Sequence, residues 1–223
     1  MKKTPLILAF ASLVPVAASA GPVPAQPITD CKAPVECHPC LSYDFIDLDY
    51  GQADFSNAFL NDDADRLGIS FSKSLGDTFF LTGSYTNTDA DYFLNGVSNG
   101  LEEHSYRLGL GARYSLAKCI DLTFEGGFDH RDITANGNGI QSFDSWGYYV
   151  GPGIRARAGR LEGFAKAFYF GREGVPAGLN INDEGWVFNP GVLFHLTDHL
   201  ALKFAADLGE DYSAVTVGAR IHF

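Results

Sequence analysis

The chain has 223 residues and a formal net charge of −11 at pH 7, and 46% of its residues are hydrophobic. The excess of acidic side chains disfavours nucleic acid as a partner, because phosphate binding needs a basic patch. After the first twenty residues there is no apolar run of about eighteen, the length that a membrane-spanning helix requires. If the chain spans a membrane, it must do so as a closed β-barrel.

The chain divides into three expected segments. Residues 1–20 have the pattern of a secretory signal peptide, with a basic start, an apolar run at 5–16 and small residues at Ala18-Ser19-Ala20. Residues 21–40 contain five of the ten prolines and three of the four cysteines, which predicts an extended segment without a core. Residues 41–223 carry the strand patterns.

The third segment alternates apolar and polar residues with the period of two that is typical of β-strands. We expect ten strands, at 43–50, 66–75, 79–85, 106–116, 120–129, 146–157, 161–170, 186–196, 200–208 and 213–223. Short turns alternate with longer loops, as in an antiparallel up-and-down barrel. Eight strands remain an alternative if two weak runs belong to loops. Pro152 and Pro190 fit badly, because each removes a ladder donor, and they predict a bulge or a shifted strand.

The direction of the alternation separates a membrane barrel from a soluble one, which would point its charges outward. Here the charges share a face with glycines and serines, whereas the other face is almost purely apolar. We therefore expect a lipid-facing exterior and a charged lumen. The expected lumen charges are Asp47, Asp49, Arg107, Arg113, Glu125, Asp129, Arg155, Arg157, Lys166, Lys203 and Arg220. Aromatic residues near the strand ends predict two interfacial girdles, with Tyr43 in one and Tyr212 in the other.

The last strand carries a family resemblance. Val215, Val217 and Ile221 alternate with polar or small residues, and Phe223 ends the sequence. With the signal peptide and the alternating strands, this ending resembles the bacterial outer-membrane β-barrel superfamily, which includes small opacity and OmpX-like barrels and porin-like barrels. The resemblance implies a Gram-negative outer-membrane location. It also implies that Val215, Val217, Ile221 and Phe223 are an insertion signal, with outer-membrane lipid and the insertion machinery as partners.

Four cysteines in an oxidising envelope predict two disulfides among Cys31, Cys37, Cys40 and Cys119. On the expected topology Cys119 lies in a turn on the same side as the N-terminal segment. We expect one of the first three cysteines to bond Cys119 and tie that segment across the barrel mouth, with the connectivity left open. The spacing of Cys37 and Cys40 also fits a redox centre, but such a centre needs a strand-to-helix turn, and the chain has none. A zinc site with His38 is equally disfavoured, and we expect no metal ion and no cofactor.

Two features bear on function. The mixed lumen charges favour a hydrogen-bonded plug over a conducting pore, because an unpaired buried charge is costly. The long loops are expected to be acidic and to attract cations or cationic ligands, although a solvated face is the simpler interpretation. The loop residues in question are Asp54, Asp62, Asp63, Asp65, Asp89, Asp91, Glu102, Glu103, Asp132, Asp144, Glu173, Asp183, Glu184, Glu210 and Asp211, with Arg172 as the only cation.

We expect a structural or surface-interaction barrel rather than an enzyme. A narrow channel for small solutes or ions is the first alternative. A rim hydrolase that uses Asp89, Asp91, Asp129, His130 and Asp132 is the second.

Overall fold

The computed structural model describes residues 40–55, 64–94, 97–136, 141–173, 184–210 and 212–223. The expected signal peptide and nearly all of the Pro-rich segment lie outside the described residues and stay predictions. The described residues contain ten strands. They are β1 (Phe45–Phe55), β2 (Ala64–Leu75), β3 (Phe79–Leu94), β4 (Val97–Ala117), β5 (Ile120–Asn136), β6 (Gln141–Ala158), β7 (Leu161–Glu173), β8 (Glu184–His195), β9 (Leu200–Gly209) and β10 (Tyr212–His222).

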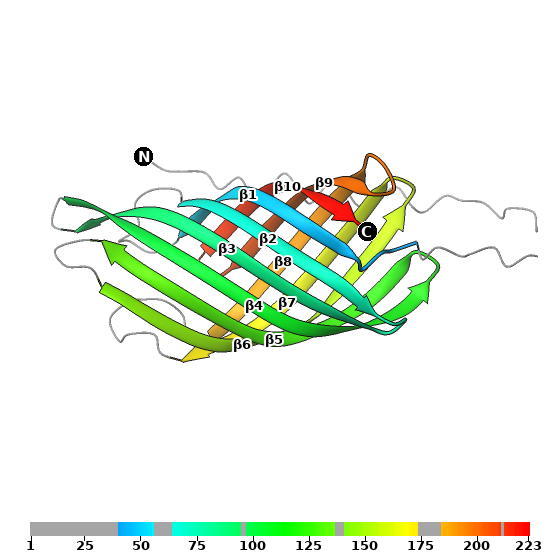
Figure 1. Ribbon diagram of the computed structural model, residues 1–223, viewed down its shortest axis with the longest axis horizontal. Helices are drawn as coiled ribbons and strands as arrows, with labels where there is room; N and C mark the ends of the chain where they lie inside the picture. The colour runs from blue at the N-terminus through cyan, green and yellow to red at the C-terminus, as the bar shows by residue number, and fades with distance from the viewer. Residues whose placement is uncertain (1–39, 56–63, 95–96, 137–140, 174–183, 211) are drawn as a thin grey trace, which may run out of the picture. The chain divides into compact units, whose positions relative to one another are not determined.

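The strands form a closed antiparallel barrel in which each pairs with its neighbours in sequence (Figure 1). β1 pairs with β10 from Phe45 opposite His222 to Phe55 opposite Tyr212, which closes the sheet. The ten-strand prediction is therefore confirmed over the eight-strand alternative. We call the end that carries the β2–β3, β4–β5, β6–β7 and β8–β9 turns the short-turn end, and the opposite end the loop end.

Glycine shapes two of the short turns. Gly76 in the β2–β3 turn has φ of 81° and Gly159 in the β6–β7 turn has φ of 61°. Residues with a β-carbon rarely adopt this left-handed conformation, so glycine allows the chain to reverse within a few residues.

The exterior of the barrel is apolar and the interior is polar. Phe128 is 73% exposed and Leu67 is 61% exposed, whereas the charged neighbour Asp129 is 1% exposed. Every strand from β1 to β10 carries at least one large apolar side chain that is exposed on the outside. Only a lipid environment removes such a surface from water, because a soluble monomer exposes far smaller apolar patches. Within the described residues, no helix is long and apolar enough to cross a membrane.

The strands at the loop end are longer than the sequence pattern predicts. β3 continues to Leu94, β4 begins at Val97 and β6 begins at Gln141. Many acidic residues expected in loops therefore lie in strands, Glu102 and Asp132 among them. The alternation of apolar and polar residues fades where a strand leaves the lipid, but the backbone hydrogen bonding continues.

Two aromatic residues expected in the girdles lie inside the barrel instead. Tyr43 precedes β1, is 2% exposed, and packs on Phe80 with 4.8 Å between ring centroids. Tyr212 packs against the buried cluster of Tyr149, Phe170 and Val187. The girdle prediction was wrong for both. Tyr212 is two residues from the inward-facing Ala214 in β10, so it faces the lumen as well. Its place in the strand outweighs the preference of tyrosine for interfaces.

Neither proline produces the bulge or shift that the sequence predicts. The β6–β7 register is the same before Gly151 and after Pro152, and the β8–β9 register is the same before Asn189 and after Pro190. The ladder is only interrupted. Pro190 has no N–H to offer Ala206, the residue opposite it. The Asn189 side chain donates to the Ala206 carbonyl instead, from Nδ2 at 3.0 Å.

A double-mutant cycle at Asn189 and Pro190 tests whether the Asn189 side chain takes the place of the missing backbone donor. We expect Asn189→Ala to lower the free energy of unfolding by about 1–3 kcal/mol, because a carbonyl in the sheet loses its donor. In a Pro190→Ala background the restored N–H should reduce that loss by about 1 kcal/mol. The loss of the Asn189 contact with Asp207 is common to both backgrounds and cancels. Equal losses in urea unfolding would show that the carbonyl does not depend on Asn189.

Candidate functional site: the charged lumen

The lumen near the short-turn end is organised around Asp47 on β1. Asp47 accepts two hydrogen bonds from Arg220, from Nε at 2.6 Å and from Nη2 at 2.8 Å. Lys203 donates to Asp47 at 2.9 Å and to Asp49 at 2.8 Å. Asp47 is 1% exposed. Two cations therefore compensate a buried carboxylate at the seam between β1, β10 and β9.

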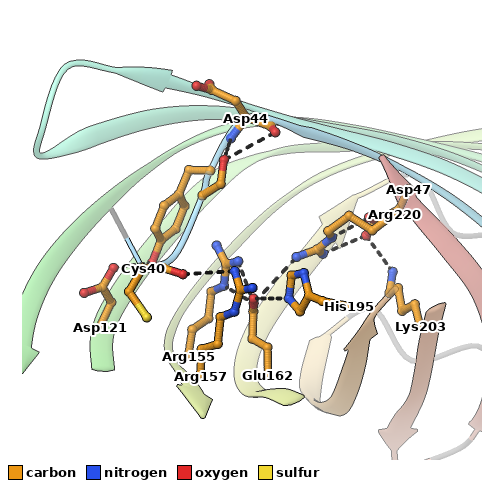
Figure 2. A network of polar contacts seen from close by, with 12 residues as sticks. Cys40, Asp44, Asp47, Asp121, Arg155, Arg157, Glu162, His195, Lys203 and Arg220 are labelled. Carbon is orange, nitrogen blue, oxygen red and sulfur yellow. Dashed lines mark hydrogen bonds and ion pairs between the residues drawn. The ribbon is translucent and has the colours of Figure 1, made fainter. Parts of the chain in front are cut away.

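Glu162 on β7 is the second anchor of this network, and it is fully buried. Arg155 donates to its Oε1 from Nε at 3.0 Å and Nη2 at 2.6 Å, and His195 Nε2 lies 3.1 Å from its Oε2. Arg220 Nη1 lies 3.9 Å from Glu162 Oε1, which links the two carboxylates (Figure 2). We call the group Asp47, Asp49, Arg155, Glu162, His195, Lys203 and Arg220 the lower network. Its members come from β1 and from β6 to β10.

A second set of ion pairs lies nearer the loop end and surrounds Asp129. Arg107 Nε donates to Asp129 at 2.9 Å and Arg172 Nε at 2.6 Å. Arg131 reaches Glu103 at 3.1 Å and approaches Asp129 at 3.7 Å. Further pairs join Arg66 to Asp207 and Lys166 to Glu125. These residues form the upper network.

The short-turn end is occupied by the segment that leads into β1. Cys40 is bonded to Cys119, and Arg157 Nη1 donates to the Cys40 carbonyl at 3.3 Å. The Tyr43 hydroxyl donates to Asp121 Oδ2 at 3.1 Å. Burial raises the pKa of the Tyr43 phenol above its usual value, so the hydroxyl keeps the proton it donates. Leu41 is buried beside Tyr43 and Phe80.

Guanidinium groups stack on the aromatic rings at this end. The Arg155 and Arg113 guanidinium carbons lie 4.4 Å and 4.8 Å from the centre of the Tyr43 ring. Arg220 lies 3.6 Å from the centre of the Phe45 ring. Such contacts are attractive because the ring face is negative, and they strengthen when water is excluded. Arg155 and Arg220 thus hold Tyr43 and Phe45 as well as the buried carboxylates Glu162 and Asp47.

The structure places all eleven lumen charges expected from the sequence on the inner side of the sheet. Nine of them belong to the lower or upper network. Arg113 and Arg157 instead bind backbone carbonyls at the short turns, those of Asp77 at 2.7 Å and Gly159 at 3.0 Å. Both also reach the segment before β1, because Arg113 stacks on Tyr43 and Arg157 donates to the Cys40 carbonyl, so they join the short turns to that segment.

Sequence reasoning misplaced some members of the site. Arg172 and Glu103 were expected in outer loops, but Arg172 lies in β7 bound to Asp129 and Glu103 lies in β4 bound to Arg131. That expectation was wrong because the strands extend past the apolar pattern. His195 was not singled out at all. The only available signal was its inward parity, one residue after the outward Phe194.

The remaining predicted residues are placed as follows. Cys40 is the partner of Cys119, whereas Cys31 and Cys37 lie outside the described residues. The side chains of the proposed insertion signal are exposed on the apolar exterior, and their role stays a prediction. They are Val215, Val217, Ile221 and Phe223.

Asp129 points inward and His130 lies on the outer face beside Trp146, so these two do not converge as a hydrolase would require. Across the described part of the chain, no three His, Cys, Asp or Glu side chains are arranged to hold a metal ion.

Comparison with known proteins supports the fold and does not assign an activity. No family model and no curated protein matches the chain. The NanC porin structure is 7% identical, covers 80% of this chain and 100% of its own, and has a TM-score of 0.50. The chain has the fold of an outer-membrane β-barrel. The translocator domain of the autotransporter NalP from Neisseria meningitidis is 10% identical, with coverages of 82% and 89% and a TM-score of 0.48. The Ail protein of Yersinia pestis is 10% identical, with coverages of 80% and 95% and a TM-score of 0.40.

The lower network predicts a large cost for removing its centre. We expect Asp47→Ala to lower the free energy of unfolding by about 3–5 kcal/mol, because Arg220 and Lys203 lose their buried partner. Unfolding in urea, followed in detergent micelles by tryptophan fluorescence, measures this. Asp198→Ala is the control, since Asp198 is exposed in the β8–β9 turn and its loss should change stability by less than about 0.5 kcal/mol. Similar effects of the two substitutions would contradict a central role for Asp47.

Proposed function

We propose that the protein is an integral outer-membrane barrel whose lumen is closed at rest and whose role is exercised at the cell surface. The observation that carries this proposal is the lower network, which joins β1 with β6 to β10 by paired and buried charges. Opening a wide pore would require those pairs to break, and each broken pair leaves a charge without its partner.

The loop end supports a surface role. Pairing of β2 with β3 ends at Asp65 and Asp89, and pairing of β6 with β7 ends at Trp146 and Glu173. Beyond these points, among the residues that the structure describes, β3 to β6 pair only with one another. We call residues 90–94, 97–105, 131–136 and 141–145 the β3–β6 extension (Figure 1). A sheet that continues past its neighbours offers both faces to whatever lies outside the membrane.

An aromatic row marks where the extension leaves the lipid. Tyr85, Tyr106, His130 and Trp146 lie opposite one another on the outer face of β3 to β6. Their successive ring centroids are 5.1, 5.9 and 4.0 Å apart. Aromatic and amphipathic rings of this kind gather at the boundary between lipid and water. The outer face beyond this row is therefore in water.

The outer face beyond the aromatic row is acidic. Asp89 lies directly opposite Glu102, and Asp132 lies directly opposite Asp144. Like charges placed opposite each other destabilise a sheet, so this arrangement has an energetic cost in the isolated protein. A cationic ligand would relieve the repulsion. We therefore propose that the extension binds cations or cationic segments, without enzymatic chemistry.

A binding comparison tests the acidic face. We expect Asp132→Asn with Asp144→Asn to weaken binding of a lysine-rich peptide, and to raise stability by about 0.2–1 kcal/mol. The control is Asp77→Asn with Asp198→Asn, which removes the same charge from exposed turns at the other end. Binding measured by calorimetry at two salt concentrations should weaken with salt. Equal binding by both double variants would exclude the extension as the site.

A narrow channel is the second candidate, and a lumen cavity of 230 Å³ favours it. Conductance of the mature protein in planar bilayers decides between the two. We expect no discrete openings from inserted protein, because the lower network and the Tyr43 segment close the lumen. Insertion is checked independently by the heat-dependent gel mobility of the folded barrel. Regular openings in the wild-type protein would overturn the closed lumen and favour the channel.

A further inference from the structure

The lumen has two unlike walls, and free space lies between them. The cavity of 230 Å³ is bounded on one side by most of the charged residues of both networks. On the other side, β2 to β4 carry Arg66, Glu103 and Arg107 toward the loop end and otherwise present small hydroxyl side chains. These are Ser70, Ser72, Thr82, Ser84, Thr86, Thr88 and Ser105. Small side chains leave room beside a sheet that larger ones would fill, so this wall gives a polar passage along the length of β2 and β3.

The passage is interrupted at the short-turn end. Tyr43 and Phe80 line the cavity, and together with Leu41 they form a buried apolar cluster. A second depression of 430 Å³ lies at the barrel mouth, and Leu41, Cys40 and Asp121 are among its lining residues. The cluster of Leu41, Tyr43 and Phe80 thus contributes to the walls of both spaces and divides one from the other.

The two aromatic residues of this cluster are held in different ways. Phe80 belongs to β3 and packs flat over Gly111, where a β-carbon would lie 2.1 Å from the Phe80 ring. Tyr43 belongs to no strand. It is held by the Asp121 hydrogen bond, by the stacked Arg113 and Arg155, and by the covalent tether three residues earlier. Of the two rings, Tyr43 is the one that can leave without breaking the sheet.

We propose that Tyr43 is the gate residue of an ion-conducting passage along β2 and β3, closed on Phe80 and kept shut by the Cys40–Cys119 disulfide. The inference rests on the closed lumen of the proposed function. The lower and upper networks together hold eight Arg and Lys side chains against seven carboxylates, so the lumen has an excess of basic groups. The opened passage therefore favours small anions over cations, in spite of the net charge of −11 of the whole chain.

Conductance of gate variants in planar bilayers tests the proposal. Tyr43→Ala should give discrete openings at least tenfold more often than wild type, and in a KCl gradient the reversal potential should have the sign of chloride preference. Tyr114→Ala is the matched control, because Tyr114 is an exposed aromatic residue on the outer face of β4. Tyr43→Phe keeps the ring and should stay closed. If Tyr43→Ala fails to fold, Phe80→Ala removes the contact between the two rings by changing the β3 residue instead, and the same increase in openings is expected.

The tether is tested separately. A dithiol reductant converts the Cys40–Cys119 bond to two thiols and is itself oxidised to a cyclic disulfide, so it should raise the opening frequency of wild type. The double variant Cys40→Ser with Cys119→Ser should open without reductant and show no response to it. Openings in untreated wild type would refute the closed lumen of the proposed function. The role of Tyr43 would then be judged by the opening frequency of the variant divided by that of wild type. The proposal would be overturned if Tyr43→Ala and Phe80→Ala both opened about as often as wild type. A reversal potential with the sign of cation preference would also overturn it.

Discussion

The ion pair between Asp47 and Arg220 is the interaction on which the barrel depends most. The two residues lie directly opposite each other in the β1–β10 register, so their side chains join the first strand to the last at the point where the sheet closes. A slip of one residue at this seam would turn Asp47 toward lipid and leave Arg220 alone inside. The cost of an unpaired charge in either place disfavours every register that is shifted by an odd number of residues.

The same constraint explains how charge is distributed in the molecule. The carboxylates of the two networks are matched by arginines and lysines, and Asp121 accepts hydrogen bonds from Tyr43 and Ser115, because each is buried and must be compensated. Carboxylates beyond the aromatic row lie opposite one another, and there His104 contacts Glu102 at 3.2 Å and His130 contacts Asp132 at 3.0 Å, while water screens the remaining repulsion. A chain with an acidic total thus contains a lumen in which basic groups outnumber acidic ones. Net charge alone would have given the wrong sign for the interior.

The sequence predicts the strands and their faces because a membrane barrel leaves a period-two pattern wherever a strand crosses lipid. It does not predict the partners within the lumen. Asp47 and Asp49 have the same parity, yet Arg220 binds Asp47 and not Asp49, since only the barrel geometry brings β10 opposite β1. Arg172 was missed for a different reason. The alternation of apolar and polar residues ends before Arg172, but β7 continues through it. The sequence therefore predicts a loop cation, whereas the structure has Arg172 bound to Asp129.

Ten strands enclose more space than their inward side chains fill. The distribution of large and small inward residues decides where the unfilled space of the lumen lies. Phe164, Phe168 and Lys166 extend from β7, while β2 and β3 carry serine and threonine. The lower network is therefore fixed to β1 and β6 to β10, and it cannot by itself close the space beside the serine and threonine side chains of β2 and β3 near the short-turn end. A side chain supplied from outside the strands must complete the closure, and Tyr43 is in the position to do so. The disulfide at Cys40 then has a function beyond stability, because it fixes a part of the closure, the segment that carries Tyr43, that the sheet does not hold.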